Sequence, residues 1–303
     1  MERRRIKNAV KSAVFVIFLI CCAAALIYGH SDPSLDRNPT AAYTVKQTDE
    51  ESVSVHFIDV GQGNSTLIQC GTVGVLIDAG EREAGDTVCD YLRTNGIERL
   101  GCVLATHPHS DHIGGLIEVL SSFPVDTVIM PALEEFNTPT TSTYEEFLTT
   151  IAQKSIPAVP ANPGDEYTFG DCSLEIFGPL SQDEELNNMS VVCRLTAFSS
   201  TFMFLADAEK EELSEIENSG AILDCDVLQA GHHGSDTSVL TSFLDKAEPE
   251  YVVISCGKNN RYGFPGEKIT DYLKGESIES YRTDLLGNIV FTCSKDKMTV
   301  TTG

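Results

Sequence analysis

Residues 106–115 constrain this chain more than any other stretch, because they place three histidines and one aspartate within six positions. The segment reads Thr-His-Pro-His-Ser-Asp-His-Ile-Gly-Gly and follows the apolar run 102–105. Five of the seven histidines in the sequence lie here or in the Gly-His-His-Gly-Ser segment 231–235. A strand that ends in such a loop turns imidazole nitrogens and a carboxylate toward one point, a ligand set that Zn²⁺ or Mn²⁺ accepts. We therefore expect a metal site in preference to a polar loop with surface histidines.

Five further phrases accompany this loop. They are Phe-Ile-Asp-Val-Gly-Gln-Gly at 57–63, Leu-Ile-Asp-Ala-Gly at 76–80, Leu-Ala-Asp-Ala-Glu at 205–209, Asp-Val-Leu at 226–228 with segment 231–235, and Asn-Arg-Tyr-Gly at 260–263. With the loop they resemble the metallo-β-lactamase superfamily of metal-dependent hydrolases, and within it the hydrolase domain of ComEC-type competence proteins. The resemblance runs from about residue 53 to the C-terminus. It implies an α/β fold, an αββα four-layer sandwich.

The pattern of apolar residues predicts two sets of strands. Alternating, β-branched residues predict strands at 53–59, 66–68 and 73–77. Helices are expected at 86–95, 113–120 and 208–217, and in the second half of 134–154. The remaining expected strands are 100–105, 125–130, 173–177, 190–196, 201–205, 227–230 and 251–255. The ten cysteines contain no Cys-x-x-Cys pair, so those in strand-like runs are predicted to be buried thiols.

The resemblance also implies a pair of divalent cations, zinc or manganese. The implied ligands are His107, His109, Asp111, His112, Asp207 and His232. Asp207 would bridge both ions, although an aspartate at this position could also cap the following helix. Catalytic roles are assigned to Asp111 and His233. His233 would face the substrate or donate a proton, and the roles of His232 and His233 could be exchanged.

One expected ligand position has no histidine. The superfamily usually has a third histidine at the first metal, but no histidine lies between His112 and His232. The corresponding phrase is Asn-Asn-Met-Ser-Val-Val at 187–192, so the resemblance implies that the Asn188 side chain or water occupies the position. Asp78, at the end of a predicted strand, would support the metal loop from behind or be an ordinary turn residue. Fewer nitrogen ligands favour Mn²⁺, with zinc as the alternative.

Paired divalent ions suit the hydrolysis of phosphodiesters, because they stabilise both the attacking and the leaving oxygen. The expected substrate contacts are Ser235, Lys258, Asn260, Arg261 and Tyr262. Ser235 would begin a helix whose N–H groups bind an anion, and segment 258–263 would supply positive charge unless it is a solvated basic turn. The ComEC-type family usually has Asp where Asn64 stands and His where Phe264 stands. These departures make a non-catalytic, metal-stabilised binding module an alternative.

The charge of the chain bears on the substrate. The formal net charge is −24, and the first 30 residues hold five of the 21 basic and one of the 45 acidic residues, so the remainder carries −28. Such a field repels nucleic acid, although bound cations would dominate locally. We expect a phosphoester substrate, with nucleic acid among the candidates. A phosphocholine-type, teichoic-acid-type or other small ester is the alternative.

The N-terminus predicts export. Basic residues precede the uncharged run 12–28, which lies just below the roughly 20 apolar residues of a typical membrane helix. Because the positive residues come first, the start should stay inside and the rest should cross the membrane. We expect a single-pass transmembrane helix that anchors an extracytoplasmic catalytic domain, with a cleaved signal peptide and secretion as the alternative. The expected parts are the anchor 1–29, a tether 30–52 and the hydrolase domain 53–303.

Overall fold

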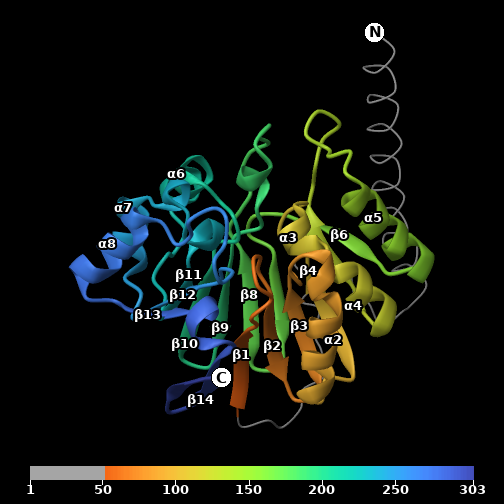
Figure 1. The fold of residues 1–303 in the computed structure, drawn as a ribbon, viewed down its shortest axis with the longest axis horizontal. Helices are drawn as coiled ribbons and strands as arrows, with labels where there is room; N and C mark the ends of the chain where they lie inside the picture. Colours follow the sequence, from red (N-terminus) through yellow and green to blue (C-terminus); the bar gives the residue numbers. More distant parts are fainter. Residues whose placement is uncertain (1–51) are drawn as a thin grey trace.

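The computed structural model describes residues 52–303, so the expected anchor and tether, apart from residue 52, lie outside the described residues. Among those described, no helix is both long and apolar enough to cross a membrane. Two β-sheets face each other, with helices on their outer sides (Figure 1). The predicted α/β architecture of two sheets flanked by helices is confirmed.

The first sheet has eight strands in the order β15-β14-β1-β2-β3-β4-β5-β6. Their bounds are β1 Ser52–Phe57, β2 Thr66–Cys70, β3 Val73–Ile77, β4 Arg99–Leu104, β5 Val128–Pro131, β6 Ala158–Ala161, β14 Ile289–Ser294 and β15 Met298–Thr302. Strands β3 to β6 run parallel, because helices return the chain between them. These connections contain η1 Arg82–Ala84, α2 Gly85–Thr94, α3 Ser110–Ile113, α4 Leu116–Ser122 and α5 Ser142–Lys154.

The second sheet has seven strands in the order β13-β12-β11-β10-β9-β8-β7. Their bounds are β7 Glu166–Phe169, β8 Cys172–Ile176, β9 Cys193–Ala197, β10 Ser200–Phe204, β11 Val227–Gln229, β12 Tyr251–Ile254 and β13 Glu279–Arg282. Strands β10 to β13 are parallel. The helices and turns of this half are η2 Leu186–Met189, α6 Lys210–Ser219, η3 Gly231–Gly234, η4 Asp236–Ser238, α7 Thr241–Ala247, α8 Glu267–Glu276 and α9 Thr283–Leu286.

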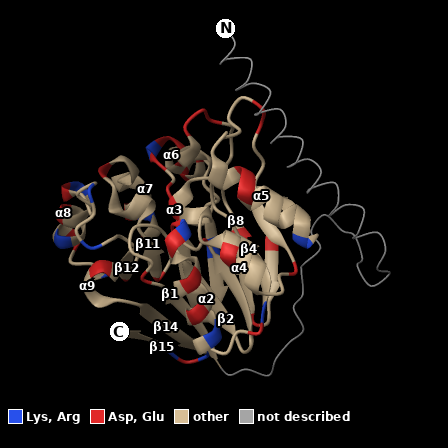
Figure 2. Cartoon of the chain, turned by 45° about the vertical axis from the view of Figure 1, so that its right-hand side comes forward, with Lys and Arg blue, Asp and Glu red and all other residues tan. Residues whose placement is uncertain are grey.

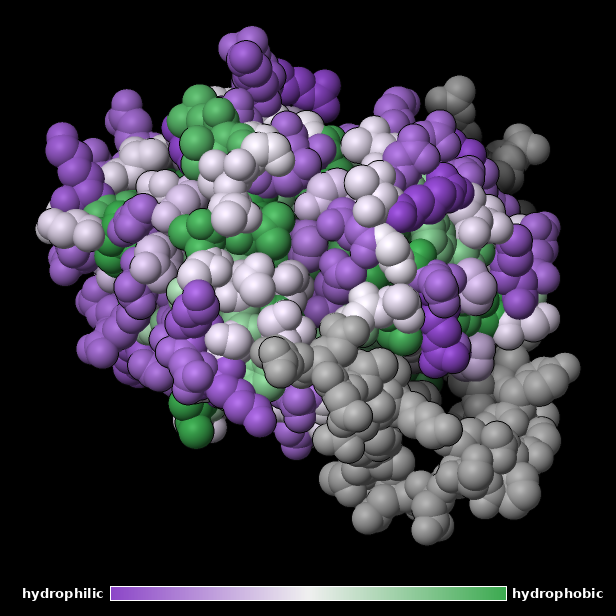
Figure 3. Space-filling model, turned by 90° about the horizontal axis from the view of Figure 1, so that it is seen from below, coloured by the Kyte–Doolittle hydropathy of each residue, from purple (hydrophilic) through white to green (hydrophobic). Residues whose placement is uncertain are grey.

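Buried apolar side chains form three layers. The middle layer lies between the sheets, and the outer two lie under α2, α4 and α5 and under α6, α7 and α8 (Figure 1). Strand β1 shows how alternation produces this division: Val55 and Phe57 face the middle layer, whereas His56 Nδ1 lies 2.9 Å from the Tyr91 hydroxyl on α2. Within residues 52–303 no disulfide forms, and every cysteine except Cys70 is buried. The face seen in Figure 3 is mainly hydrophilic, with separate small apolar patches.

Two predicted elements differ from the structure near the metal loop. The expected helix 113–120 is divided at Gly114 and Gly115 into α3 and α4. A Cβ atom on Gly115 would lie 2.1 Å from the Ala79 carbonyl oxygen, so glycine allows the loop to pack against the end of β3. The expected strand 190–196 begins only at Cys193, because Val191 N instead donates to Thr106 O at 2.8 Å. In both places, a backbone contact with the metal loop replaces the regular helix or strand that the sequence predicts.

A buried acid on α6 makes stability depend on pH. Glu212 is 4% exposed, and burial, with the negative charge of Glu215, raises its pKa well above 4.5. The folded state therefore retains a proton that the unfolded chain releases. The contribution of this group is fully present below pH 4.5 and is lost as pH rises through the folded pKa.

We predict that Glu212→Gln stabilises the protein at pH 8 by about 1–3 kcal/mol, because it removes a charge buried without compensation. Melting temperatures from pH 5 to 9 should fall less steeply for this variant than for the wild type. Glu211→Gln, at an exposed position on the same helix, is the control. Parallel curves for wild type and Glu212→Gln would contradict the assignment.

Candidate metal centre

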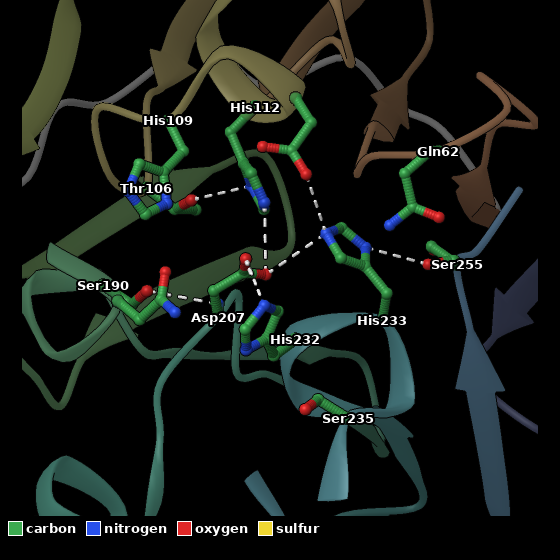
Figure 4. A network of polar contacts seen from close by, with 12 residues as sticks. Gln62, Thr106, His109, His112, Ser190, Asp207, His232, His233, Ser235 and Ser255 are labelled. Atoms are coloured by element: carbon green, nitrogen blue, oxygen red, sulfur yellow. Dashed lines mark hydrogen bonds and ion pairs between the residues drawn. The ribbon is translucent and has the colours of Figure 1, made fainter. Parts of the chain in front are cut away.

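The candidate ligands come from both sheets and meet where strands end. The histidine-rich loop follows β4 in the first sheet, whereas Asp207 follows β10 and the paired histidines follow β11 in the second. Figure 4 shows these side chains turned toward one another around Asp207. Carboxyl ends of parallel strands are the usual location of sites in α/β proteins. The two halves of the chain therefore contribute to one cluster.

Asp78 supports the cluster from beneath. It is fully buried, at a backbone φ of 57° that few non-glycine residues adopt. Its Oδ1 accepts from Thr106 N at 2.9 Å, and its Oδ2 accepts from Thr106 Oγ1 at 2.7 Å and from His112 Nδ1 at 2.6 Å. The structure places Asp78 behind the histidine-rich loop, the position that the resemblance to the superfamily implies. A proton held on His112 Nδ1 leaves Nε2 as a lone-pair donor.

One group of candidate ligand atoms contains Asp111, His112, Asp207 and His233, all within 4.8 Å of one another. His112 Nε2 lies 3.1 Å from Asp207 Oδ1, and His233 Nε2 lies 3.2 Å from Asp111 Oδ2. His233 Nδ1 lies 3.0 Å from the Ser255 carbonyl oxygen, to which it donates. The Nε2 atoms of both histidines therefore face carboxylate oxygens with lone pairs.

Facing lone pairs in a buried site require a proton or a cation between them. His112 Nε2 and Asp207 Oδ1 are buried, and neither has another hydrogen-bond partner in the described chain. Burial lowers the pKa of His112, but the carboxylates of Asp207 and Asp78 outweigh it and raise the pKa well above 6.5. The negative charge that would retain a proton here also attracts a metal ion. The residues fit a divalent cation with nitrogen and oxygen ligands.

A second group contains His107, His109 and Asp207. His107 Nε2 lies 3.0 Å from His109 Nδ1 and 3.6 Å from Asp207 Oδ2. Burial lowers the pKa of both histidines, so they are neutral imidazoles, the form that binds metals. Asp207 thus directs one oxygen toward each group.

The structure exchanges the positions predicted for the paired histidines. His233 is buried in the first group, whereas His232 is in neither. The His232 side chain is 22% exposed, with Nε2 3.7 Å from Asp207 Oδ2 and Nδ1 3.3 Å from Glu209 Oε1. Both histidines have left-handed backbone angles, φ 48° and 55°. This turn directs the second histidine, and not the first, into the buried cluster.

The asparagine beside the cluster is Asn187 and not the predicted Asn188. Asn188 Nδ2 donates to Asp183 Oδ2 at 3.1 Å, and its Oδ1 accepts from Glu209 N at 3.2 Å, so this side chain ties loops together. Asn187 instead lines the pocket at the cluster. Its Nδ2 donates to Glu209 Oε1 at 3.2 Å, while its Oδ1 is buried with no hydrogen-bond partner among the described residues. The resemblance implied Asn188, whereas its neighbour Asn187 is the asparagine that lines the pocket.

A pocket of about 390 Å³ opens onto the cluster, within the range of about 300 to 1,000 Å³ for small-molecule sites. The candidate ligands His109, Asp111, Asp207 and His233 line it. The rest of the lining includes Gln62, Thr141, Thr143, Tyr262 and Phe264. The expected contact Tyr262 therefore reaches the pocket. Its ring stacks on Phe264, with centroids 5.4 Å apart.

Three of the other expected substrate contacts are engaged elsewhere or lie outside the pocket. Ser235 begins only the three-residue turn η4, and its Oγ accepts from Thr237 N, so no helix presents N–H groups there. The Asn260 amide organises its own loop through bonds to Gly257 O and Phe264 O. Lys258 is exposed and does not line the pocket. The structure therefore does not support these three assignments: local hydrogen bonds satisfy Ser235 and Asn260, and Lys258 lies away from the pocket lining.

Arg261, the remaining expected contact, is exposed and does not line the pocket, but it packs against Tyr262, which does. Its guanidinium carbon lies 4.9 Å from the Tyr262 ring centroid, and its Nη2 donates to the Tyr262 hydroxyl at 2.7 Å. The aromatic ring therefore holds this cation next to one residue of the pocket lining.

This fold and site define a class of protein. The family description Metallo-beta-lactamase superfamily matches residues 58–258. The chain therefore belongs to this superfamily, whose members are generally metal-dependent hydrolases. Among solved structures, the diiron β-hydroxylase CmlA from Streptomyces venezuelae is similar in fold, with a TM-score of 0.53 at 12% identity over 82% of this chain and 55% of CmlA.

Within the superfamily, the chain is similar to proteins of the ComEC family. It is 30% identical over 258 residues to ComE operon protein 3 of Bacillus subtilis strain 168, an alignment that covers 78% of this chain and 32% of that protein. It is 28% identical over 253 residues to the competence protein ComA of Neisseria gonorrhoeae, covering 82% of this chain and 34% of ComA. The chain thus spans about a third of the length of these relatives.

We predict that Asn187→Ala weakens metal binding at the group of His107 and His109 by about 10- to 100-fold, because it removes a buried oxygen that has no partner among the described residues and belongs to the pocket lining. Titration calorimetry with Mn²⁺ and Zn²⁺ measures this. Asn188→Ala is the matched control and should lower thermal stability while the metal affinity stays that of the wild type. Equal metal affinities for both variants and the wild type would refute the role of Asn187.

Proposed function

We propose that this chain is a metal-dependent hydrolase of phosphoester bonds, a phosphodiesterase of the nuclease type. The observation that supports the proposal most is Asp207, whose two carboxylate oxygens face different histidine groups. A carboxylate so placed suits two divalent cations, zinc or manganese, and paired cations suit phosphoryl centres. The name of one relative, the competence protein ComA, refers to competence, so nucleic acid is one of the phosphoesters to test.

The residues of this chain would hold and orient the cations. When bound, the cations would supply Lewis acidity and lower the pKa of a water molecule to near neutral. The proposed ligands are His107, His109, Asn187 and Asp207 for one cation, and Asp111, His112, Asp207 and His233 for the other. Asp78 and the Ser255 carbonyl accept from Nδ1 of His112 and His233, which keeps each Nε2 directed at the cluster. Asp111, with its side chain 22% exposed, also faces the pocket that receives the substrate.

His232 is the proposed proton donor to the leaving oxygen. It lines the pocket, and Glu209 Oε1 lies 3.3 Å from its Nδ1, so Nε2 is the atom available to substrate. Glu209 also accepts from Asn187 Nδ2 and from Thr237 Oγ1 at 2.9 Å. Glu209 is therefore a positioning residue that contacts both the proton donor His232 and the proposed metal ligand Asn187. A histidine within reach of the reacting group is a common general acid.

The acidic surface limits the substrate. Carboxylates are spread over the helices and loops in Figure 2, and basic side chains are fewer. Phosphate neutralisation by Lys and Arg dominates tight nucleic-acid binding, so we propose short or single-stranded phosphodiesters that enter the pocket past Arg261 and Tyr262. A phosphocholine-type, teichoic-acid-type or other small ester is the alternative within the same mechanism. The N-terminal segment 1–29 is proposed to anchor the domain outside the cytoplasm.

A non-catalytic, metal-stabilised module is the second candidate, and Asn64 favours it. Both polar atoms of its side chain are buried without a partner in the described chain, and its backbone N donates to Asp111 O at 3.2 Å. An amide here brings no negative charge to the metal loop, unlike the aspartate that is usual in the family. Metal binding without turnover would identify this second function.

We predict that His232→Ala lowers kcat by about 10²- to 10⁴-fold with unchanged metal content, because it removes a proton donor and no ligand. His233→Ala, the matched neighbour, should lose metal as measured by elemental analysis. Metal loss in His232→Ala alone would restore the assignment made from sequence.

The full chain, loaded with Mn²⁺ or Zn²⁺, is predicted to hydrolyse bis-p-nitrophenyl phosphate and single-stranded DNA more readily than a β-lactam or a phosphocholine ester. Two ions per chain are expected by elemental analysis. Chelation and Asp207→Ala should each abolish turnover, whereas Asp171→Ala, at an exposed turn position, should not. Turnover that survives both treatments would exclude the mechanism, and preference for another ester would redirect the substrate assignment.

A further inference from the structure

Gln62, in the turn after β1, has a buried amide donor without an acceptor. The residue lines the pocket at the metal cluster. Its Oε1 accepts from Gly257 N at 3.2 Å, whereas its Nε2 is buried and has no hydrogen-bond partner in the described chain. Buried donors are nearly always paired, because an unpaired one loses its hydration without compensation. Gln62 Nε2 is an exception to this rule, and the residue lies in the lining of a pocket. We therefore expect its acceptor to be a bound ligand.

The orientation of the Gln62 amide follows from its neighbour. A backbone N–H donates only to the carbonyl oxygen of a carboxamide, so the bond from Gly257 N places Oε1 on the side of Gly257 and Nε2 on the opposite side. Figure 4 shows the amide nitrogen turned toward the side on which His233 and Asp207 lie. The donor is therefore directed at the cluster.

Two close backbone contacts hold this turn in place. A Cβ atom on Gly257 would lie 2.8 Å from Gln62 N, and one on Gly63 would lie 2.3 Å from Asp111 O. Asn64 N also donates to Asp111 O at 3.2 Å. The turn is thus packed between the metal loop and segment 257–264. Donors fixed before substrate arrives stabilise charge without the cost of reorganisation.

We propose that Gln62 is a catalytic residue whose Nε2 donates a hydrogen bond to an anionic, non-bridging oxygen of the phosphoryl group at the metal centre. This inference rests on the proposed function and extends it. The pocket lining also contains the carboxylates Asp111 and Asp207, which repel an anion. A neutral donor in the same lining orients the phosphoryl oxygens without adding a competing ligand for the cations.

The test uses the full chain with its metal, in the variants Gln62→Glu and Gln62→Met. Gln62→Glu retains an acceptor for Gly257 N but replaces the donor with a carboxylate oxygen. Gln62→Met removes the amide and retains the length of the side chain. We expect kcat/KM on bis-p-nitrophenyl phosphate to fall about 10²- to 10³-fold in Gln62→Met, and further in Gln62→Glu. The Kd for inorganic phosphate, from calorimetry, should rise at least about 10-fold, with unchanged metal content.

Gln69 provides the matched control. Its Nε2 donates to Gly71 O at 2.9 Å and to Asn95 O at 2.8 Å, so Gln69→Met should lower the melting temperature and preserve kcat/KM. Gln62→Met should lower the melting temperature less and kcat/KM much more, because it removes one hydrogen bond within the protein, from Gly257 N, and a donor that has no acceptor among the described residues. A purely structural role for Gln62 predicts lower melting temperature with little change in phosphate affinity.

The outcomes separate the two proposals. If the wild type turns over substrate and both Gln62 variants match it in kcat/KM and phosphate affinity, the assignment of Gln62 is wrong and the proposed function stands. If the metal-loaded wild type neither turns over a phosphoester nor binds phosphate, the proposed function fails and the assignment of Gln62 fails with it. Loss of activity in parallel with loss of folded protein also overturns the catalytic role.

Discussion

The buried charge of Asp207 is the constraint on which the arrangement of this protein depends. A carboxylate that is 2% exposed is costly unless positive charge compensates it. Burial raises the pKa of Asp207, but His112 and His233 outweigh it and hold the pKa well below its usual range. These histidines belong to different sheets, so the compensation requires the two halves of the fold to be assembled. Metal binding and folding should therefore be thermodynamically linked.

The candidate ligands are held in position by groups that lie behind them and do not themselves face the pocket. Asp78 fixes the tautomer of His112, and the Ser255 carbonyl fixes that of His233. The close approaches of Gly63 and Gly115 bring the first three strands of the sheet against the metal loop. Each of these contacts restricts the rotation of a candidate metal-binding side chain away from the cluster. A metal site within a flexible loop would lack this preorganisation.

The pocket region brings a cation and a hydrogen-bond donor close together in a protein with a net charge of −24. Acidic residues are spread over the helices and loops (Figure 2), whereas Arg261 is held beside Tyr262 and Gln62 directs a donor inward. Phe264 stacks on Tyr262 and contacts His232, with ring centroids 5.5 Å apart. This aromatic pair makes one side of the pocket apolar. Under the proposed function, the pocket would favour a short or single-stranded phosphodiester.

The sequence by itself determined the histidine-rich loop and the order of strands and helices, because these depend on local spacing and on strand periodicity, while the two-sheet fold and the role of Asp78 were implied by the resemblance of its motifs to the superfamily. Only the tertiary structure decided which member of each adjacent pair faces the cluster, His233 over His232 and Asn187 over Asn188. It also showed that Ser235 and Asn260 are satisfied locally and that Gln62 faces the pocket. The physical reason is that these orientations depend on left-handed backbone angles and on contacts between residues far apart, such as Asp111 with His233, 122 positions away, and Gln62 with Gly257, 195 positions away.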